Sequence, residues 1–508
     1  MRFEHKEINL FAEVIMPRKK KQVDGENTGA RRRAKVAARG ESKVVKDLAE
    51  RVRQEVTARL GPNATFEQRR DAAAGLMAEV LWKDTDRDLR DAVTDAEEVE
   101  VDDQRYVRLE QRSSAMYFGR WGPHLIDEAL YRQAGVHNGP TIKPIELRAG
   151  IIEHMTPDMA RVVGELFADR SSRHVERTLK TVGMTAPSRS FLEKRGKQMA
   201  GELTEHIGEL EAETHTAAAL PEHVAAIACG MDRMAVRMTE PLGPSAPPPP
   251  PPYRPEPYER KPPPPKEHNY RMAWVGSTTL YDRRGEPLLI YRYAADAKSD
   301  PAEIARRIAA DVAWATNQDP KVAVHCIQDG AKELRVLPET LTRQLPANTV
   351  IRDLVDFEHL AGYLDAVVDA TQPAGDPRQW KAWYRDELLH DDRAIDRIWR
   401  KLRELGRRLS RDESAAREAV AKALSYIRKR KSKMRYATLY AKSLPIGSGV
   451  TENTCWTMQD RVKRPGQSWE TNGLSGILAL RSLVESDRWT HAWPAYAATH
   501  RREVRAAA

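Results

Sequence analysis

Two apolar runs, residues 224–232 and 321–331, constrain the fold of this chain more than any other feature. Both are short and rich in Val, Ala and Ile; the first ends in Asp232 and the second carries Asp329. Continuous apolar runs of this length are typical of strands that are buried on both faces, as in a parallel sheet. The sequence therefore predicts an α/β protein in which two carboxylates lie at strand ends.

A third acidic residue, Glu452, lies in a stretch that predicts a turn leading into a helix, residues 445–456. Ser448 is placed to cap this helix, and Gly447 and Gly449 are expected to take conformations that other residues avoid. Helical spacing then predicts a packed stripe and an adjacent outer stripe. The packed stripe is Thr451, Cys455, Met458 and Val462, and the outer one is Glu452, Trp456, Gln459 and Lys463.

Together, Asp232, Asp329 and Glu452 would form an all-oxygen site of the kind that holds Mg²⁺. In two-metal sites such ions activate an attacking oxygen and stabilise a leaving one during phosphodiester cleavage or transfer. A lone glutamate on a surface helix is better explained by solvation. The two further carboxylates favour the metal site.

Several segments resemble bacterial insertion-sequence DDE transposases of the Kra group, relatives of the Mutator-like transposases. Residues 446–489 carry the most specific motifs, Gly-Ser-Gly-x-x-Glu, Arg-x-Lys-Arg-x-Gly-x-x-Trp and Leu-Arg-Ser-Leu-Val. The resemblance extends from about Tyr106 to about Trp493. Three further segments are similar to the first-aspartate, second-aspartate and Asp-x-x-His elements of that group: residues 232–241, 328–331 and 356–360.

The resemblance implies a retroviral-integrase-like core in which Asp232, Asp329 and Glu452 are catalytic and bind two Mg²⁺ ions, for which Mn²⁺ can substitute. Asp356 and His359 are possible accessory residues, although a hydrogen-bonded structural histidine is an equal alternative. The implied function is a transposase that binds element ends, cleaves DNA and transfers strands. The alternatives are a transposase-derived DNA-binding protein without catalysis and an RNase H-like nuclease that only hydrolyses.

The net charge of +9 and the isoelectric point near 9.2 suit a polyanionic partner. The resemblance implies double-stranded DNA, both the terminal inverted repeats of the element and its target, bound by a homodimer or higher oligomer. For Trp469, burial in the core is the main alternative to DNA contact. The candidate DNA-binding residues are Arg189, Lys194, Arg195, Arg461, Lys463, Arg464 and Trp469.

The three cysteines are isolated and lie in predicted buried elements, so we expect reduced core thiols. No structural zinc is expected, because His137 stands alone where members of the Kra group have a cysteine pair. The chain has no run of about 18 apolar residues. We expect no secretory leader, no membrane partner and a cytoplasmic bacterial protein that joins the nucleoid when bound to DNA.

Three short helices between residues 156 and 210 have a basic third member, which predicts a helix-turn-helix; a small structural bundle is the alternative. The third helix continues through Met199, Leu203, Ile207 and Leu210 as a dimer seam or as an arm that links this module to the core.

Strands and helices alternate after residue 224 in the order of an RNase H-like core: three strands, a helix and a fourth strand. A proline-rich insertion interrupts this core, and an all-helical insertion with a basic face precedes Glu452. The predicted divisions are a disordered basic arm or solvated tail, 1–43; N-terminal helices, 44–98; a small β segment, 99–140; the helix-turn-helix-like region and long helix, 141–220; the first part of the core, 221–370, with its proline-rich insertion, 241–268; the helical insertion, 371–444; C-terminal core helices, 445–496; and a tail, 497–508.

Overall fold

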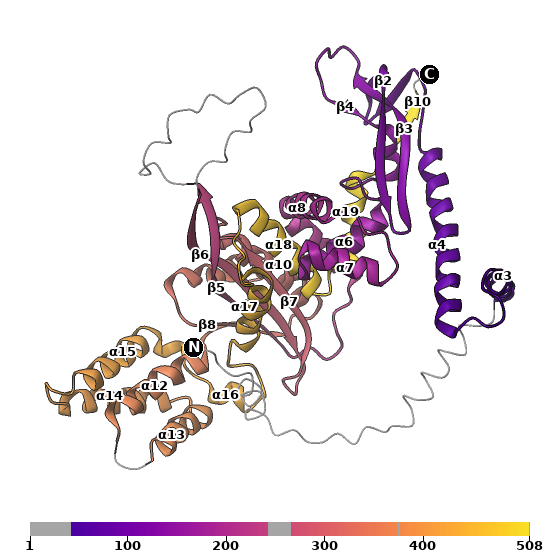
Figure 1. Cartoon of the computed structure of the whole chain (residues 1–508). Coiled ribbons are helices and arrows are strands. Elements are labelled where there is room, and N and C mark those ends of the chain that lie inside the picture. The colour runs from indigo at the N-terminus through magenta and orange to yellow at the C-terminus, as the bar shows by residue number, and fades with distance from the viewer. Residues whose placement is uncertain (1–41, 242–265, 374–375, 507–508) are drawn as a thin grey trace. The chain divides into compact units, whose positions relative to one another are not determined.

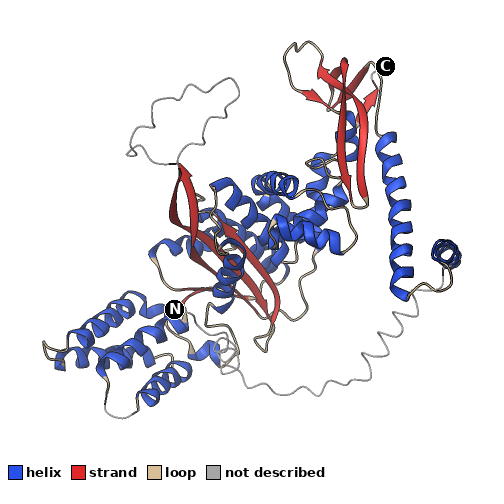
Figure 2. Cartoon of the chain, viewed as in Figure 1, coloured by secondary structure: helices blue, strands red, loops and turns tan. Residues whose placement is uncertain are grey.

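The computed structural model describes residues 42–241, 266–373 and 376–506. Over these ranges the protein is mixed α/β, as the sequence predicts, and it contains two five-stranded sheets (Figures 1 and 2). None of the helices described combines the length and apolar character that crossing a bilayer requires. The predicted basic arm, 1–43, and most of the proline-rich insertion, 242–265, lie outside the described residues apart from positions 42 and 43.

The chain divides into two units between Lys83 and Asp84. The first contains α3 (Lys43–Leu60) and most of α4 (Phe66–Asp91). Thr65 and Gln68 form a reciprocal capping box at the start of α4, with hydrogen bonds of 3.2 and 2.8 Å, because each side chain accepts from the other's backbone N–H.

The small sheet of the second unit has the order β10-β1-β2-β3-β4 and is antiparallel throughout. Residues 497–508, predicted as a tail, instead contribute the end of a helix and β10, whose Val504 pairs with Val101 of β1. Val504 is buried, so an apolar contact accompanies the pairing. The strands are β1 (Glu98–Val101), β2 (Gln104–Gly119), β3 (Gly122–Gln133), β4 (Thr141–Ile142) and β10 (Val504–Ala506).

A helical layer joins segments from both ends of the second unit. Gly476 of α18 (Thr471–Glu485) and Ala200 of α8 (Arg189–Glu205) meet where these two helices pack together. A Cβ on Gly476 would lie 2.8 Å from the Ala200 backbone. The predicted long helix breaks at His206, and its apolar residues Met199, Leu203, Ile207 and Leu210 are buried in this shared core, which favours the linking arm over a dimer seam. The other helices are α5 (Pro144–Ala149), α6 (Pro157–Asp169), α7 (Ser172–Thr181), α9 (Ile207–Ala217) and α19 (Trp489–His500).

The central sheet has the order β7-β6-β5-β8-β9. Strand β6 is antiparallel to both of its neighbours, β7 and β5, whereas β5, β8 and β9 run parallel. Helices α10 (Pro301–Gln318) and α11 (Val336–Gln344) provide the connections that parallel strands require. The strands are β5 (Ala226–Pro241), β6 (Lys266–Tyr281), β7 (Pro287–Ala295), β8 (Ala323–Gln328) and β9 (Ile351–Val355).

Alternation along β5 decides which helix meets which side chain. Ile227, Cys229 and Met231 share a hydrophobic cluster with α10. Met234 and Val236 share another cluster with α17 (Gly449–Val462) and α18. Because successive side chains of a strand point to opposite faces, Asp232 belongs on the α17 face.

Strands β5 and β6 are longer than predicted. The apolar run in the sequence ends at Asp232 and the predicted insertion covers 241–268, but the two strands pair continuously as far as Pro241 and Lys266. The physical reason is that Met234, Val236 and Met238 continue the alternation of buried positions. The pair forms a long ribbon that ends at the segment drawn in grey (Figure 2).

The predicted helical insertion between β9 and Glu452 has a hydrophobic core of its own. Its apolar residues recur at helical spacing, and Ala394, Ala423 and Tyr436 are completely buried. The helices are α12 (Phe357–Thr371), α13 (Pro377–His390), α14 (Ala394–Arg408), α15 (Ser414–Arg430) and α16 (Ala437–Tyr440).

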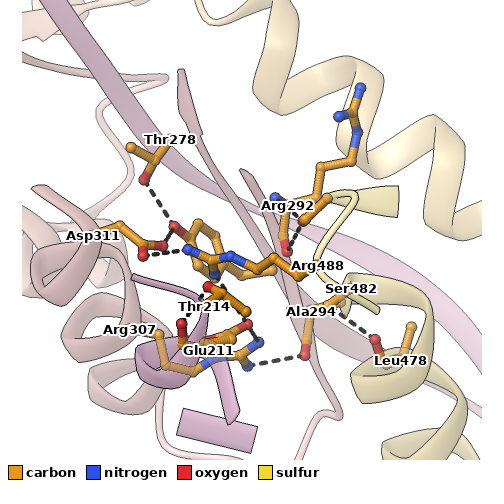
Figure 3. Close-up of polar contacts among 12 residues, drawn as sticks. Glu211, Thr214, Thr278, Arg292, Ala294, Arg307, Asp311, Leu478, Ser482 and Arg488 are labelled. Carbon is orange, nitrogen blue, oxygen red and sulfur yellow. Dashed lines mark hydrogen bonds and ion pairs between the residues drawn. The ribbon is translucent and has the colours of Figure 1, made fainter. Parts of the chain in front are cut away.

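A buried ionic network fastens α9 and α10 to the start of α19. Arg307 donates to both carboxylate oxygens of Glu211, at 2.7 and 2.6 Å, and Arg488 is paired with Asp311 (Figure 3). Tyr293 also donates to Asp311. Each of the four charged side chains is at most 7% exposed, so every charge depends on its partner.

Candidate active site

The two predicted aspartates lie at the same level of adjacent parallel strands. Cys229 of β5 is in register with Cys326 of β8, and each aspartate follows three residues later, Asp232 on β5 and Asp329 just beyond β8. Neighbouring strands are about 4.8 Å apart. The sheet therefore brings Asp232 and Asp329 to one edge, as the sequence predicts.

Asp356 occupies the next position along this edge. Gln328 of β8 is in register with Val355 of β9, and the Asp356 N–H donates to the Gln328 carbonyl over 2.8 Å. Asp329 and Asp356 each follow the last paired residue of their strand. Three aspartates thus lie on adjacent strands at the same level of the sheet. Asp329 and Asp356 follow the carboxyl ends of β8 and β9, and Asp232 lies within β5.

Helix α17 packs on the sheet where β5 has no side chain. A Cβ on Gly230 would lie 2.5 Å from the Ile327 carbonyl oxygen and 2.7 Å from the Thr451 hydroxyl. That hydroxyl is also 2.7 Å from the Ser277 hydroxyl of β6. Only glycine at position 230 allows the helix to come this close. The close approach places the first turn of α17, which contains Glu452, beside the strand ends that carry the aspartates.

The packed stripe of α17 is confirmed, because Thr451, Cys455, Met458 and Val462 are buried. In the predicted outer stripe, Glu452, Trp456 and Lys463 are exposed, whereas Gln459 is partly buried. The Cys455 thiol donates to Asp232 Oδ2 over 3.3 Å. The packed stripe therefore reaches the first aspartate, a contact that the sequence analysis did not identify.

The predicted capping of this helix is wrong in two details. Ser448 precedes α17 but its side chain caps no backbone N–H; its hydroxyl lies 3.5 Å from Glu452 Oε1. Gly447 and Gly449 are not among the glycines with positive φ. The turn is instead held by Asp356, whose Oδ2 accepts the Ser448 N–H and whose Oδ1 accepts the His359 N–H over 2.6 Å.

The closest group of metal-ligating side chains in the described ranges is Asp356, His359 and Glu452, whose ligand atoms all lie within 4.8 Å of one another. This differs from the predicted set, because Asp232 and Asp329 are not members of so tight a group. Each carboxylate also accepts a nearby backbone N–H: Asp232 that of Arg233 and Asp329 that of Ala331, each at 2.7 Å. The accessory pair named from the sequence is thus nearest to Glu452.

The charges of the five side chains act on one another. Partial burial raises the pKa of Glu452, and the charges of Asp356 and Asp232 raise it further. The Asp356 carboxylate raises the pKa of His359, with smaller contributions from Asp329 and Glu452. Burial alone would raise the pKa of Asp356, but hydrogen bonds from His359 and Ser448 outweigh burial and lower it. Such a concentration of negative charge suits a cation.

The donors fit a hard divalent ion. Asp232, Asp329, Asp356 and Glu452 supply oxygen ligands, which Mg²⁺ and Mn²⁺ prefer. Burial and the charges of Asp356 and Asp232 raise the pKa of Glu452 more than His359 lowers it, and a bound cation would favour the charged carboxylate. Asp356 is buried and already accepts two backbone N–H groups, so its fixed position would orient the neighbouring ligands.

Two of the predicted DNA-binding residues are buried, which favours a structural role for both and, for Trp469, the alternative given from the sequence. Arg461 is 2% exposed, and its guanidinium lies over the rings of Phe167 and Trp469. Trp469 is 8% exposed and its Nε1 donates to the Val462 carbonyl over 2.9 Å. Both side chains belong to the helical core.

The remaining candidates reach the surface to different degrees. Lys463, Arg189 and Lys194 are exposed. Arg464 is partly buried and pairs with Asp460 at 3.2 Å, and Arg195 pairs with Glu153 at 2.6 Å. DNA contact by these residues remains a prediction, and the exposed lysines have the greater freedom to make it.

Comparison with known proteins gives no assignment for this chain. No protein-family model matches it, and no curated protein matches it at a significant level. Any function must therefore be argued from the residues and their geometry.

Proposed function

We propose that the protein is a metal-dependent DDE transposase that cleaves the ends of a DNA element and joins them to a target. The observation that carries the proposal is the placement of Asp232 and Asp329 on adjacent parallel strands, at the end of the sheet on which the first turn of α17, with Glu452, packs. Asp356 and His359, the nearest ligand groups to Glu452, lie at the same end. The sequence resemblance to Kra-group transposases names Asp232, Asp329 and Glu452. A site of this composition suits phosphodiester chemistry.

The strand order supports an RNase H-like core as part of this proposal. Three antiparallel strands followed by two parallel ones, in the order β7-β6-β5-β8-β9, place the first and fourth strands side by side. This is the arrangement expected from the resemblance. The helical insertion between β9 and Glu452 also falls where it is expected.

Asp232, Asp329 and Glu452 would hold the metal ions, and Asp356 would support them. When bound, the ions supply a polarised oxygen nucleophile and charge stabilisation at phosphorus. The chain itself fixes the ligands: Gly230 and Thr451 seat α17, and Asp356 holds the turn before it. The His359 ring lies 3.7 Å from the Asp356 carboxylate, which raises the pKa of the imidazole, and it would face a phosphate oxygen.

The test is Glu452→Gln, which keeps the size of the side chain and removes its charge. We expect cleavage of a labelled element end in Mg²⁺ to be lost, while a mobility-shift assay shows equal or tighter DNA binding. Glu470→Gln, an exposed glutamate paired with Lys266, is the matched control and should cleave normally. The substrate ends are taken from the DNA that flanks the gene, where this proposal predicts inverted repeats.

Cleavage at the wild-type rate by Glu452→Gln would contradict the proposal. A strand-transfer assay with pre-cleaved ends separates the transposase from a nuclease. A pure nuclease yields no joined product, because it uses only water as the nucleophile.

A further inference from the structure

A cavity of about 490 Å³ opens beside the candidate active site, between α12 and α15. Its lining begins at His359 and Glu452 and continues along one face of α12 through Gly362, Tyr363 and Ala366. These α12 positions are three or four residues apart or adjacent, so they form a single helical face. The cavity is therefore continuous with the carboxylate cluster.

Small side chains make the hollow. Gly362 and Ala366 of α12 face Ala419 of α15 across it. A Cβ on Gly362 would meet no atom within 4 Å. The space thus exists because three lining positions, two on α12 and one on α15, lack bulk, and it is lined mainly by apolar atoms.

One wall of the cavity is aromatic and is tied to the second aspartate. The Tyr363 ring stacks on that of Tyr426, with centroids 4.1 Å apart and an angle of 21° between the planes. The Tyr426 hydroxyl donates to the Asp329 carbonyl over 2.6 Å. Because this contact fixes Tyr426, it also fixes the ring that stacks on it and faces the cavity.

The lining of the cavity also includes a cation. Lys422 lines the cavity and is mostly exposed, with its ammonium 2.7 Å from Glu418. An exposed ion pair of this kind is weak and is readily exchanged for another anion. A planar ligand inside the cavity could therefore have one anionic group near the metal ligands and another near Lys422.

We propose that this cavity receives one unpaired nucleobase of the DNA strand whose phosphate lies at Glu452. The inference rests on the proposed function and names its substrate as an end with a base removed from the stack. Stacking of a base on an aromatic side chain contributes about 1–3 kcal/mol and tolerates any base. That gain offsets the few kcal/mol needed to unstack a base. The cost of unstacking is smallest for a base that is already unpaired.

The experiment fills the cavity without disturbing the fold. Gly362→Leu places a side chain in open space on a helix, and Gly208→Leu does the same in α9, away from the cavity, as the matched control. The probe is an element end with 2-aminopurine beside the scissile phosphate, bound in Ca²⁺ so that the readout needs no cleavage. We expect the fluorescence change of the wild type and of Gly208→Leu to be lost in Gly362→Leu, with affinity for the probe reduced about fivefold or more.

A second pair of variants tests the aromatic wall. Tyr363→Phe keeps the ring and should retain the fluorescence change, whereas Tyr363→Leu should lose it. An unchanged signal in Gly362→Leu or Tyr363→Leu would overturn the pocket, as would a wild type that binds the probe in a mobility shift without any fluorescence change. Failure of the proposed function looks different, because Glu452→Gln would then cleave normally while the base signal still depended on Gly362.

Discussion

The thiol of Cys455 donates a hydrogen bond to the Asp232 carboxylate over 3.3 Å, although 223 residues separate the two in the chain. Burial raises the pKa of Cys455, and the charge of Asp232 raises it further. The thiol is therefore protonated at neutral pH and acts as a donor. A small, neutral donor is compatible with a carboxylate that must also bind a cation.

This contact predicts an unreactive thiol whose modification would block the site. We expect N-ethylmaleimide to label Cys455 much more slowly in the native protein than in urea, since the thiolate is the reactive form and the residue is only 7% exposed. Once Cys455 is labelled, cleavage should be lost. Cys455→Ser keeps the donor and should cleave normally, and rapid native labelling followed by mass spectrometry would contradict the expectation.

Glu452 should lower the stability of the metal-free protein. A carboxyl whose pKa is raised by folding contributes stability at low pH, and this contribution is lost as pH rises through the raised pKa. At neutral pH in EDTA we therefore expect Glu452→Gln to melt at a higher temperature than the wild type. Addition of Mg²⁺ should stabilise the wild type and have little effect on the variant. Differential scanning fluorimetry checks both, and an equal Mg²⁺ shift in the two proteins would remove Glu452 from the metal site.

Gly230→Ala should move α17 away from the sheet. Its Cβ would meet the Ile327 carbonyl and the Thr451 hydroxyl at under 3 Å, which we expect to lower the free energy of unfolding by about 1–3 kcal/mol. Cleavage should fall more than stability alone explains, because Glu452 follows Thr451. Gly208→Ala, in open space on α9, is the control for the substitution. Urea denaturation and the cleavage assay are the measurements; full activity in Gly230→Ala would show that α17 tolerates the shift.

Arg307→Met should be strongly destabilising. It leaves the buried Glu211 carboxylate with only Arg488, at 3.8 Å, and removing one partner of a buried ion pair costs about 3–5 kcal/mol. Arg306→Met changes the exposed neighbour and should have little effect. Chemical denaturation of the two variants distinguishes them, and similar unfolding midpoints would show that the network contributes nothing to stability.

Substitution of Lys463 should change DNA binding, whereas substitution of Arg461 should not. Lys463→Glu should weaken DNA binding and reduce the slope of affinity against salt by about one, because an exposed cation that contacts phosphate releases counterions. Arg461→Met should leave the slope unchanged. Within the described part of the chain, Arg461 Nε and Nη1 have no hydrogen-bond partner. We therefore expect the free energy of unfolding of Arg461→Met to differ from that of the wild type by less than about 1 kcal/mol, or to be higher. A salt titration in which Arg461→Met alters the slope would restore that residue as a DNA contact.

The sequence predicts what depends on short-range periodicity. The strands through Asp232 and Asp329, the buried stripe of α17 and the capping box at Thr65 all follow from patterns within a few residues. The burial of Arg461 also had such a signal: it lies three residues after Met458 and is therefore on the packed stripe. The charge of Arg461 favoured a surface position, but the side chain is buried, as its position on the packed stripe predicts.

The rest depends on contacts between distant segments. Nothing near Arg307 in the sequence indicates Glu211, which lies 96 residues away, and nothing near Ser448 indicates Asp356. The length of β5 and β6 depends on their pairing with each other. The cavity beside Glu452 arises only when α12 and α15 pack together.

The pairing of β10 with β1 has a consequence for biosynthesis. About 400 residues separate the two strands, so during translation β1 emerges long before the strand that covers its outer edge. Until then the backbone N–H and C=O groups of that edge are open to any other extended segment. Newly made chains on one messenger would be close enough to exchange this strand, and chaperone binding to the unfinished sheet would protect it until the partner segment arrives.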